Sequence, residues 1–159
     1  MPSSSAHRGY ADPTTGPLFS PRFVIALLLA VVGIAWIVFY YVVVRVDPTV
    51  LPAPKAGGPK LFETLVDWKG VNWNYVGGFG LLFTGLMLCA HPSTPLGRGR
   101  GVVVGMLSCF LIGLIWICTF YVVSDDPSAI PVVNDLGQYN LLVGIAFMAV
   151  GFAFATRWE

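Results

Sequence analysis

The sequence predicts an all-α membrane protein with four transmembrane helices, arranged as two parallel two-helix repeats with both termini cytoplasmic. Three observations lead to this fold class. Of the 159 residues, 56% are hydrophobic and 11% are charged, whereas soluble domains carry about a quarter charged residues. Four long stretches lack Asp, Glu, Lys and Arg, and the two halves of the chain share residues at matched spacings.

The four uncharged stretches are candidates to cross a membrane. They run over 23–44, 73–90, 101–123 and 136–156. A bilayer core of about 30 Å needs about 20 helical residues, and the second stretch is the shortest and is rich in glycine. Helices are expected because lipid offers no water to satisfy backbone groups. The first stretch is too long for a signal peptide, so we expect it to be retained. Asn134 and Asp135 are expected to cap the fourth helix.

Basic residues in the short loops predict the orientation. The loop at 92–100 contains Arg98 and Arg100, whereas the loop at 124–135 has no basic residue and is acidic. Basic short loops stay in the cytoplasm. The predicted organisation is a flexible cytoplasmic tail at 1–20, a first two-helix repeat at 21–91 with an extracytoplasmic loop at 46–72, a cytoplasmic basic loop at 92–100, and a second two-helix repeat at 101–159.

The long first loop contains an amphipathic stretch. Apolar side chains recur near helical spacing over 60–69, with charged side chains between them. This pattern predicts a short helix lying at the membrane surface, with Trp68 and Trp73 at headgroup depth. An ordinary polar loop with a few apolar anchors is the alternative.

The second half of the chain repeats the first. A tryptophan with the same glycine and isoleucine neighbours recurs 80 residues later, as Trp36 and Trp116. Asn74 and two following glycines recur 66 residues later, around Asn140. The change of offset places a deletion of about 13 residues in the second loop, where the amphipathic stretch is missing. Because each half has two helices, both halves enter from the same side, unlike inverted transporter repeats.

The residues needed for catalysis or coupled transport are absent from the four stretches. A coupled transporter places an ionisable residue at membrane depth, and no stretch has one. His7 and His91 lie in the tail and at a helix end, whereas haem and metal ligands converge inside a bundle. The three cysteines lack zinc-site spacing. We therefore expect no enzyme activity, catalytic residue, cofactor or metal, and the net charge of +1 gives no indication of nucleic-acid binding.

Small and matched residues mark candidate surfaces for protein interaction. Glycines four or eight positions apart at the start of the third stretch would let another helix approach closely. Packing within the chain and contact with a partner both fit this stripe. The matched tryptophans fit either the outer interface or the seam between repeats, and the matched asparagines fit hydrogen bonding or capping. The predicted interaction residues are Trp36, Asn74, Gly101, Gly105, Gly113, Trp116, Asn140, Gly144 and Gly151.

The last fifty-odd residues resemble a known family. LIGLIWICTFYV at 111–122 and LGQYNLLVGIAFMAVGFAFATRWE at 136–159 look like the actinobacterial cell-division protein CrgA family, whose members are usually small two-helix membrane proteins. The first half resembles the pattern more loosely, through Trp36 and the stretch WNYVGGFGLLFTGLML, so this chain would be a tandem version. Family members commonly have a strongly basic N-terminal tail, whereas here only Arg8 and Arg22 remain.

The resemblance implies a non-enzymatic scaffold or regulator of cell division and septum formation, located in the plasma membrane and enriched at the septum. It also implies that the protein recruits or modulates septal peptidoglycan synthesis proteins, with a septal transpeptidase and the tubulin-like GTPase ring as partners. The less basic tail weakens the expectation for contacts that depend on it. A small accessory subunit of a larger membrane complex, such as a respiratory supercomplex, is the alternative, and a transporter is a third, less favoured reading.

Overall fold

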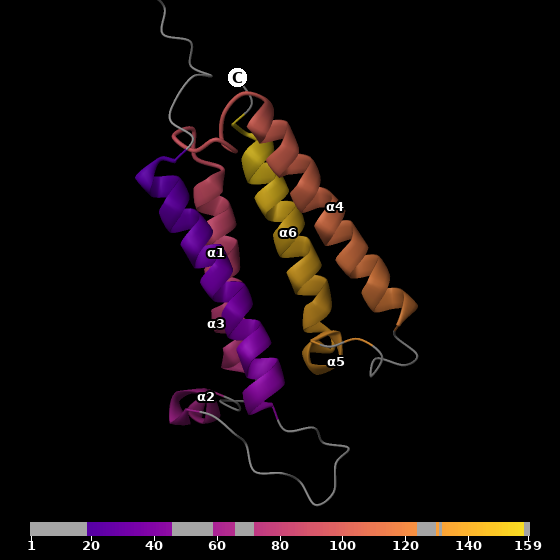
Figure 1. Ribbon diagram of the computed structural model, residues 1–159. Helices are drawn as coiled ribbons and strands as arrows, with labels where there is room; N and C mark the ends of the chain where they lie inside the picture. The colour runs from indigo at the N-terminus through magenta and orange to yellow at the C-terminus, as the bar shows by residue number, and fades with distance from the viewer. Residues whose placement is uncertain (1–18, 46–58, 66–71, 124–129, 131, 158–159) are drawn as a thin grey trace, which may run out of the picture.

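The computed structural model describes residues 19–45, 59–65, 72–123, 130 and 132–157. The elements in order are α1 (Pro21–Phe39), the π-helical turn η1 (Tyr40–Val44), α2 (Lys60–Thr64), α3 (Trp73–Cys89), α4 (Arg100–Val122), α5 (Val133–Leu136) and α6 (Tyr139–Ala155). No strand occurs in these ranges. The four long helices lie side by side, as Figure 1 shows. The predicted all-α class is therefore confirmed.

Two stretches of helix are long and apolar enough to cross a membrane. These are α1 together with η1, over 24 residues, and α4, over 23 residues. Helices α3 and α6 are also apolar but have 17 residues each. At a rise of 1.5 Å per residue they extend ~26 Å, slightly less than the ~30 Å of a bilayer core. The four uncharged stretches thus contain four long apolar helices, two of full spanning length.

The last long helix begins later than the sequence predicts. It starts at Tyr139 because Gly137, with a φ of 48°, interrupts the chain after the short helix α5. Glycine adopts such left-handed angles without the steric cost that other residues carry. The expected caps are also wrong, because Asn134 and Asp135 lie within α5. The residue at the N-cap of α6 is Gln138, whose side chain makes no capping hydrogen bond.

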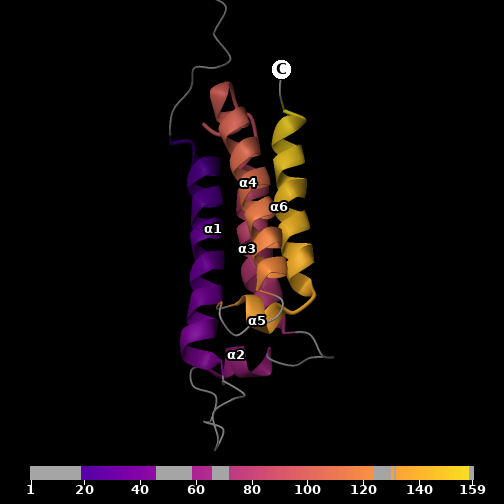
Figure 2. The same ribbon diagram turned by 90° about the vertical axis from the view of Figure 1, so that its right-hand side faces the viewer.

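The long helices form two antiparallel pairs. Helix α1 packs on α3 and α4 packs on α6, and the two pairs meet mainly through α3 and α6. The start of α1, the turn between α3 and α4, and the end of α6 lie at one end of the bundle, which we call the termini end (Figures 1 and 2). Helices α2 and α5 lie at the other end, the short-helix end. Two repeats inserted in the same sense would have this arrangement.

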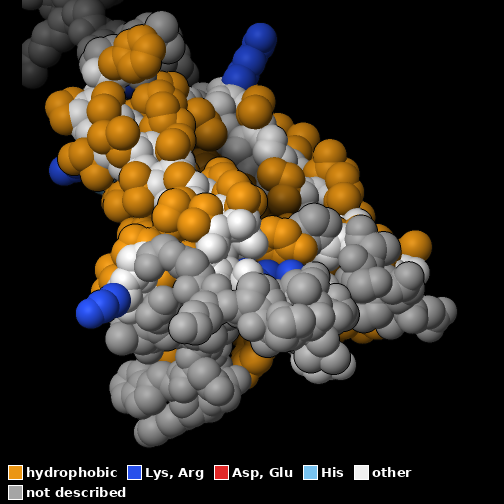
Figure 3. Space-filling view, turned by 60° about the horizontal axis from the view of Figure 1, so that its bottom comes forward, with side chains coloured by type: hydrophobic (Ala, Val, Ile, Leu, Met, Phe, Trp, Pro, Cys, Tyr) orange, Lys and Arg blue, Asp and Glu red, His pale blue; other side chains and the backbone are white. Residues whose placement is uncertain are grey.

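Buried apolar side chains form two clusters between the helices. One includes Tyr40, Phe79 and Phe147, and the other includes Ala26 and Phe154. The outer faces of the helices are apolar too, and hydrophobic side chains cover most of the described surface in Figure 3. Exposed large hydrophobic residues on the outer faces include Leu28, Val31, Val104, Leu111, Leu114, Leu142 and Ile145. Such a surface suits contact with lipid, since soluble monomers rarely expose apolar patches of this extent.

A compact turn joins the two pairs at the termini end. Thr94 is fully buried there, and its hydroxyl donates to the carbonyl oxygens of Cys89 and His91. The same hydroxyl oxygen accepts from the backbone N–H of Gly97. A Cβ on Gly97 would lie only 2.0 Å from the carbonyl oxygen of His91. Close backbone packing therefore fixes this basic turn.

Candidate interaction site

Matched glycines set the spacing between the helices of each repeat. A Cβ on Gly33 would lie 2.6 Å from the carbonyl oxygen of Gly78. A Cβ on Gly113 would lie 2.7 Å from the carbonyl oxygen of Gly144. Each residue of the second pair follows its counterpart by the offset found in the sequence, 80 for one helix and 66 for the other. The backbones thus touch at the same crossing in both repeats, which supports the duplication.

A second matched glycine extends each helix contact toward the termini end. A Cβ on Gly85 would lie 2.6 Å from the carbonyl oxygen of Ala26, whereas one on Gly151 would lie 3.3 Å from that of Met106. Ala26 and Met106 are themselves 80 positions apart. The register of the two pairs is therefore the same, and the first pair is packed more closely here.

The two glycines that begin the predicted stripe contact other parts of the chain. A Cβ on Gly105 would lie 2.5 Å from the ring of Phe154 in α6. A Cβ on Gly101 would lie 2.0 Å from the carbonyl oxygen of Pro95, in the turn before α4. Packing inside the chain thus accounts for the small size of the predicted glycines, and a role in contacts with other proteins stays a prediction.

The two matched asparagines hold the short helices against the long ones. Asn74 and Asn140 are both fully buried. The Nδ2 of Asn74 donates to the carbonyl oxygen of Phe62 in α2 at 2.9 Å. The Nδ2 of Asn140 donates to the carbonyl oxygens of Val133 in α5 at 2.7 Å and of Gly137 at 2.8 Å. The short helices α2 and α5 therefore occupy equivalent places in the two repeats.

Neither asparagine caps a helix. The side chain of Asn72 caps α3 by accepting from the backbone N–H of Asn74 at 3.1 Å. The Oδ1 atoms of Asn74 and Asn140 are buried without a hydrogen-bond partner among the described residues. A buried polar atom without a partner lowers stability. The hydrogen bonds donated by Nδ2 are therefore the contacts by which each asparagine stabilises the fold.

The two matched tryptophans lie in different surroundings. The ring of Trp36 lies 4.5 Å from that of Phe62 in α2. The ring of Trp116 lies edge-on to Phe79 of α3, with the centroids 6.0 Å apart, and so reaches the first repeat. Phe83 of α3 meets Phe147 of α6 in the same way, at 4.9 Å. Of the two positions left open by the sequence, Trp116 thus takes the seam between the repeats, whereas Trp36 packs against α2.

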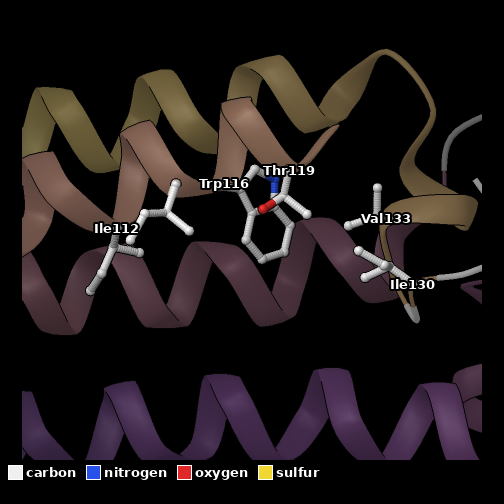
Figure 4. Close-up of a pocket in the computed structure, with 6 residues that line it drawn as sticks. Ile112, Trp116, Thr119, Ile130 and Val133 are labelled. Carbon is white, nitrogen blue, oxygen red and sulfur yellow. The ribbon is translucent and has the colours of Figure 1, made fainter. Parts of the chain in front are cut away.

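An apolar pocket opens beside Trp116 at the short-helix end. Its volume is about 220 Å³. Figure 4 shows the side chains of α4 along one wall, with residues near and within α5 closing the end. The described residues that line it are Ile112, Ile115, Trp116, Thr119, Ile130 and Val133.

A charged contact links the two repeats at the short-helix end. The Nε of Arg45, which follows η1, donates to the Oδ2 of Asp135 in α5 at 2.6 Å. The hydroxyl of Tyr75 in α3 donates to the same oxygen at 2.7 Å. The side chains of Arg45 and Asp135 are only 12% and 17% exposed, so water screens their attraction less than it would on an open surface. This contact was not predicted from the sequence, although the predicted topology puts these two opposite charges at the same end of the bundle.

Aromatic and polar groups surround this ion pair. The Arg45 guanidinium lies 4.9 Å from the ring centroid of Tyr41, a cation–π distance. The Tyr40 and Tyr75 rings meet edge to face at 5.1 Å, and Asn72 donates to the Tyr40 hydroxyl. The short-helix end is therefore a polar and aromatic cap on an otherwise apolar bundle.

The histidine and cysteine side chains in the described part of the chain are spread over different places. Among the described residues, no three side chains of His, Cys, Asp or Glu gather where they could hold a metal ion. His91 lies at the termini end, where it contacts the guanidinium of Arg22 at 3.1 Å. Cys89 and Cys109 are buried, and Cys118 is exposed.

Comparison with known proteins places the similarity in the second repeat. The family model described as "Cell division protein CrgA" matches residues 95–159. A cell division protein CrgA of Streptomyces avermitilis is 41% identical over 64 residues, which cover 40% of this chain and 71% of that protein. Proteins of the same name from Mycobacterium sp. strains KMS and JLS are 36% identical over 53 residues, covering 31% of this chain and 56% of each relative. No solved structure matches.

Proposed function

The chain belongs to the CrgA family of cell-division proteins, and on that premise we propose that it is a non-enzymatic, four-span membrane scaffold of the division septum. One observation carries the proposal: the similarity covers a complete helix pair, α4 and α6, and the turn before it. Since α1 and α3 repeat that pair with the same glycine crossing, the chain resembles two family units in tandem.

The packing of the helices supports the proposal of four membrane crossings. Helix α1 with η1 is long enough to cross, and α3 lies against it from the Gly33 crossing to the Ala26 contact. A helix packed along a spanning helix over this length shares its depth in the membrane. Trp73 and Tyr139 begin α3 and α6 and are 37% and 52% exposed, as expected for aromatic residues at a membrane interface.

The proposed orientation puts the termini end in the cytoplasm. Arg98 lies in the turn at this end and Arg100 begins α4 there, whereas Asp135 lies at the short-helix end. Basic residues favour the cytoplasmic side. In this orientation α2, α5 and the polar cap at the short-helix end face the space where peptidoglycan is assembled.

The proposed partners are membrane proteins of the division machinery, with a septal transpeptidase and the tubulin-like GTPase ring as candidates. The outer faces of α1 and α4 expose large apolar side chains along their length. In lipid, helices associate through close side-chain packing and not through apolarity alone, so the proposed contact requires a partner helix whose shape fits these faces. A scaffold of this kind would recruit or modulate peptidoglycan synthesis proteins through helix and loop contacts.

A fluorescent fusion of the full chain tests the proposal in dividing actinobacterial cells. We expect fluorescence concentrated at septa, together with co-purification of septal proteins in mild detergent. The matched control is a similarly expressed four-helix membrane protein without a division role, which should spread evenly. An even distribution of this chain, with respiratory cytochromes as its main co-purifying proteins, would reject the septal role and favour the accessory-subunit alternative.

A further inference from the structure

The first repeat fills a space next to its tryptophan with an aromatic side chain. Phe62 of α2 is 9% exposed, and its ring lies 4.5 Å from that of Trp36 and 5.2 Å from that of Phe39. The Phe62 carbonyl is held by Asn74. The short helix α2 therefore inserts a buried phenylalanine against α1.

The second repeat has smaller residues in the equivalent places. Val133 stands where Phe62 does, because the carbonyls of both accept from the matched asparagines. Thr119 follows Phe39 by 80 positions, the offset of this helix. Two aromatic rings of the first repeat are thus replaced by Val and Thr, and both of these line the pocket beside Trp116. The pocket is the space that Phe62 fills in the other repeat.

The size and walls of the Trp116 pocket suit an aromatic ring. An apolar cavity of about 150 Å³ accepts benzene, and this pocket is larger, at about 220 Å³. Its lining is apolar apart from the indole nitrogen and the Thr119 hydroxyl. The indole N–H groups of Trp116 and Trp36 are both buried without a hydrogen-bond partner among the described residues. Because Trp36 has this state beside Phe62, the unpaired N–H of Trp116 does not indicate a polar occupant.

We propose that the Trp116 pocket binds a phenylalanine presented by a short amphipathic segment of a partner protein, at the outer surface of the membrane. The internal repeat supplies the template for the occupant, since the chain itself places such a segment, α2, over Trp36. Part of the wall, Ile130 and Val133, follows the end of α4. A segment lying at the membrane surface can therefore reach the Trp116 pocket as α2 reaches the ring of Trp36.

The proposal does not rest on the septal role, although its placement at the outer surface of the membrane rests on the proposed orientation. It concerns a surface of the purified protein, and it would hold for a partner in any membrane complex. Binding at the pocket without septal localisation would keep this inference and reject the division role. Septal localisation without binding at the pocket would keep the division role and reject this inference.

A peptide copy of the template segment, residues 57–69 with 4-fluorophenylalanine at position 62, serves as the probe. It is added to the full chain in lipid nanodiscs, and binding is followed by ¹⁹F NMR. We expect a saturable change of the fluorine signal with the native chain and none with empty nanodiscs. Filling the pocket by Val133→Phe should weaken binding at least about tenfold, because the ring would occupy the central contact.

Two controls and three contrary outcomes define the test. The neighbouring exposed change Asn134→Ala should leave binding unchanged, and moving the fluorinated ring to position 65 in a peptide that carries Phe62→Ala should abolish it. Absence of saturable binding, or equal binding by the Val133→Phe chain, would overturn the proposal. Quenching of tryptophan fluorescence by brominated acyl chains, reduced by Val133→Phe, would assign the pocket to lipid and overturn it as well.

Discussion

The two repeats share their helix crossing and differ in what covers it. Gly33 meets Gly78 and Gly113 meets Gly144 with nearly equal clearance, so the backbones of the two helix pairs pack in the same way at this point. At the short-helix end, the first repeat inserts Phe62 beside its tryptophan, whereas the second leaves a pocket. Backbone contact at the glycines therefore constrains the spacing of the helices, whereas the short helices between them differ in their contacts.

The short helix of the second repeat links the two repeats. Asp135 of α5 accepts from Arg45 and Tyr75, which both belong to the first repeat. Helix α2 of the first repeat instead packs on its own α1, through Phe62. One short helix thus seals its own repeat, and the other joins the two repeats.

The largest effect is expected from a methyl group at the glycine crossings. Gly33→Ala and Gly113→Ala each place a Cβ against a carbonyl oxygen across the helix pair, and the helices must move apart. Overpacking of this kind costs about 1–3 kcal/mol, and backbone contact puts these sites at the upper limit. Thermal unfolding in detergent, followed by circular dichroism, should show a similar fall of Tm for both variants.

Gly80→Ala is the matched control for the crossing variants. A Cβ at Gly80 would meet nothing within 4 Å, although Gly80 lies in the same helix as Gly78. We expect its Tm to stay unchanged or to rise slightly, since alanine favours the helix more than glycine does. A strong effect of only one crossing variant would contradict the equivalence of the repeats.

The next largest effect is expected at the buried asparagines. Asn140→Ala removes two hydrogen bonds to carbonyl oxygens, whereas Asn74→Ala removes one. Loss of a buried partner costs about 1–3 kcal/mol, so both variants should unfold at lower temperature, and Asn140→Ala should fall further. Asn134→Ala, at an exposed position of α5, is the control. An equal loss at Asn134 would show that the buried amides are not the cause.

Breaking the link between repeats is expected to have a smaller effect. Asp135→Asn removes the charge that Arg45 pairs with, while an amide oxygen can still accept from Tyr75. A half-buried pair of this kind is worth about 1 kcal/mol. A double-mutant cycle with Arg45→Met, measured by chemical unfolding, should give a coupling energy of that size. A coupling energy near zero would contradict a stabilising link between the repeats.

Making the second repeat resemble the first should change stability least. Val133→Phe restores the ring that α2 supplies in the first repeat, and the pocket has room for it. We expect the free energy of unfolding to stay within about 1 kcal/mol of the native value, because overpacking costs arise only where space is lacking. The reverse change, Phe62→Val, should lower Tm through the lost contacts with Trp36 and Phe39. A loss with Val133→Phe as large as that of Gly113→Ala would show that the pocket is not the equivalent space.

The sequence predicted the four long helices and the repeat because both depend on local patterns. Runs of uncharged residues locate apolar helices, and the offsets of Trp116 and Asn140 identify the matched positions. The charge pattern of 60–69 also indicated a short helix, and the first five of these residues form α2, while Trp68 lies outside the described residues. These features need no knowledge of how distant segments meet.

The features that the sequence did not predict depend on tertiary contacts. Helix α5 is only four residues long, too short for a periodic pattern of apolar residues to indicate it. It is held in place by the hydrogen bond from Asn140, which lies outside the helix. The pairing of Arg45 with Asp135 joins residues 90 positions apart. The pocket follows from Val133 and Thr119 standing where the first repeat has aromatic rings, a difference that matters only once the two repeats are superposed in space.

Insertion of both repeats in the same sense is the central claim, and cysteine labelling in intact cells tests it most directly. Single cysteines replace Lys60 in α2, Asn134 in α5 and Arg98 in the turn, in a chain whose own three cysteines are changed to alanine. A membrane-impermeant thiol reagent should label positions 60 and 134 from outside, and position 98 only after the membrane is opened. Labelling of 60 and 134 from opposite sides, or of 98 from outside, would contradict two parallel repeats with cytoplasmic ends.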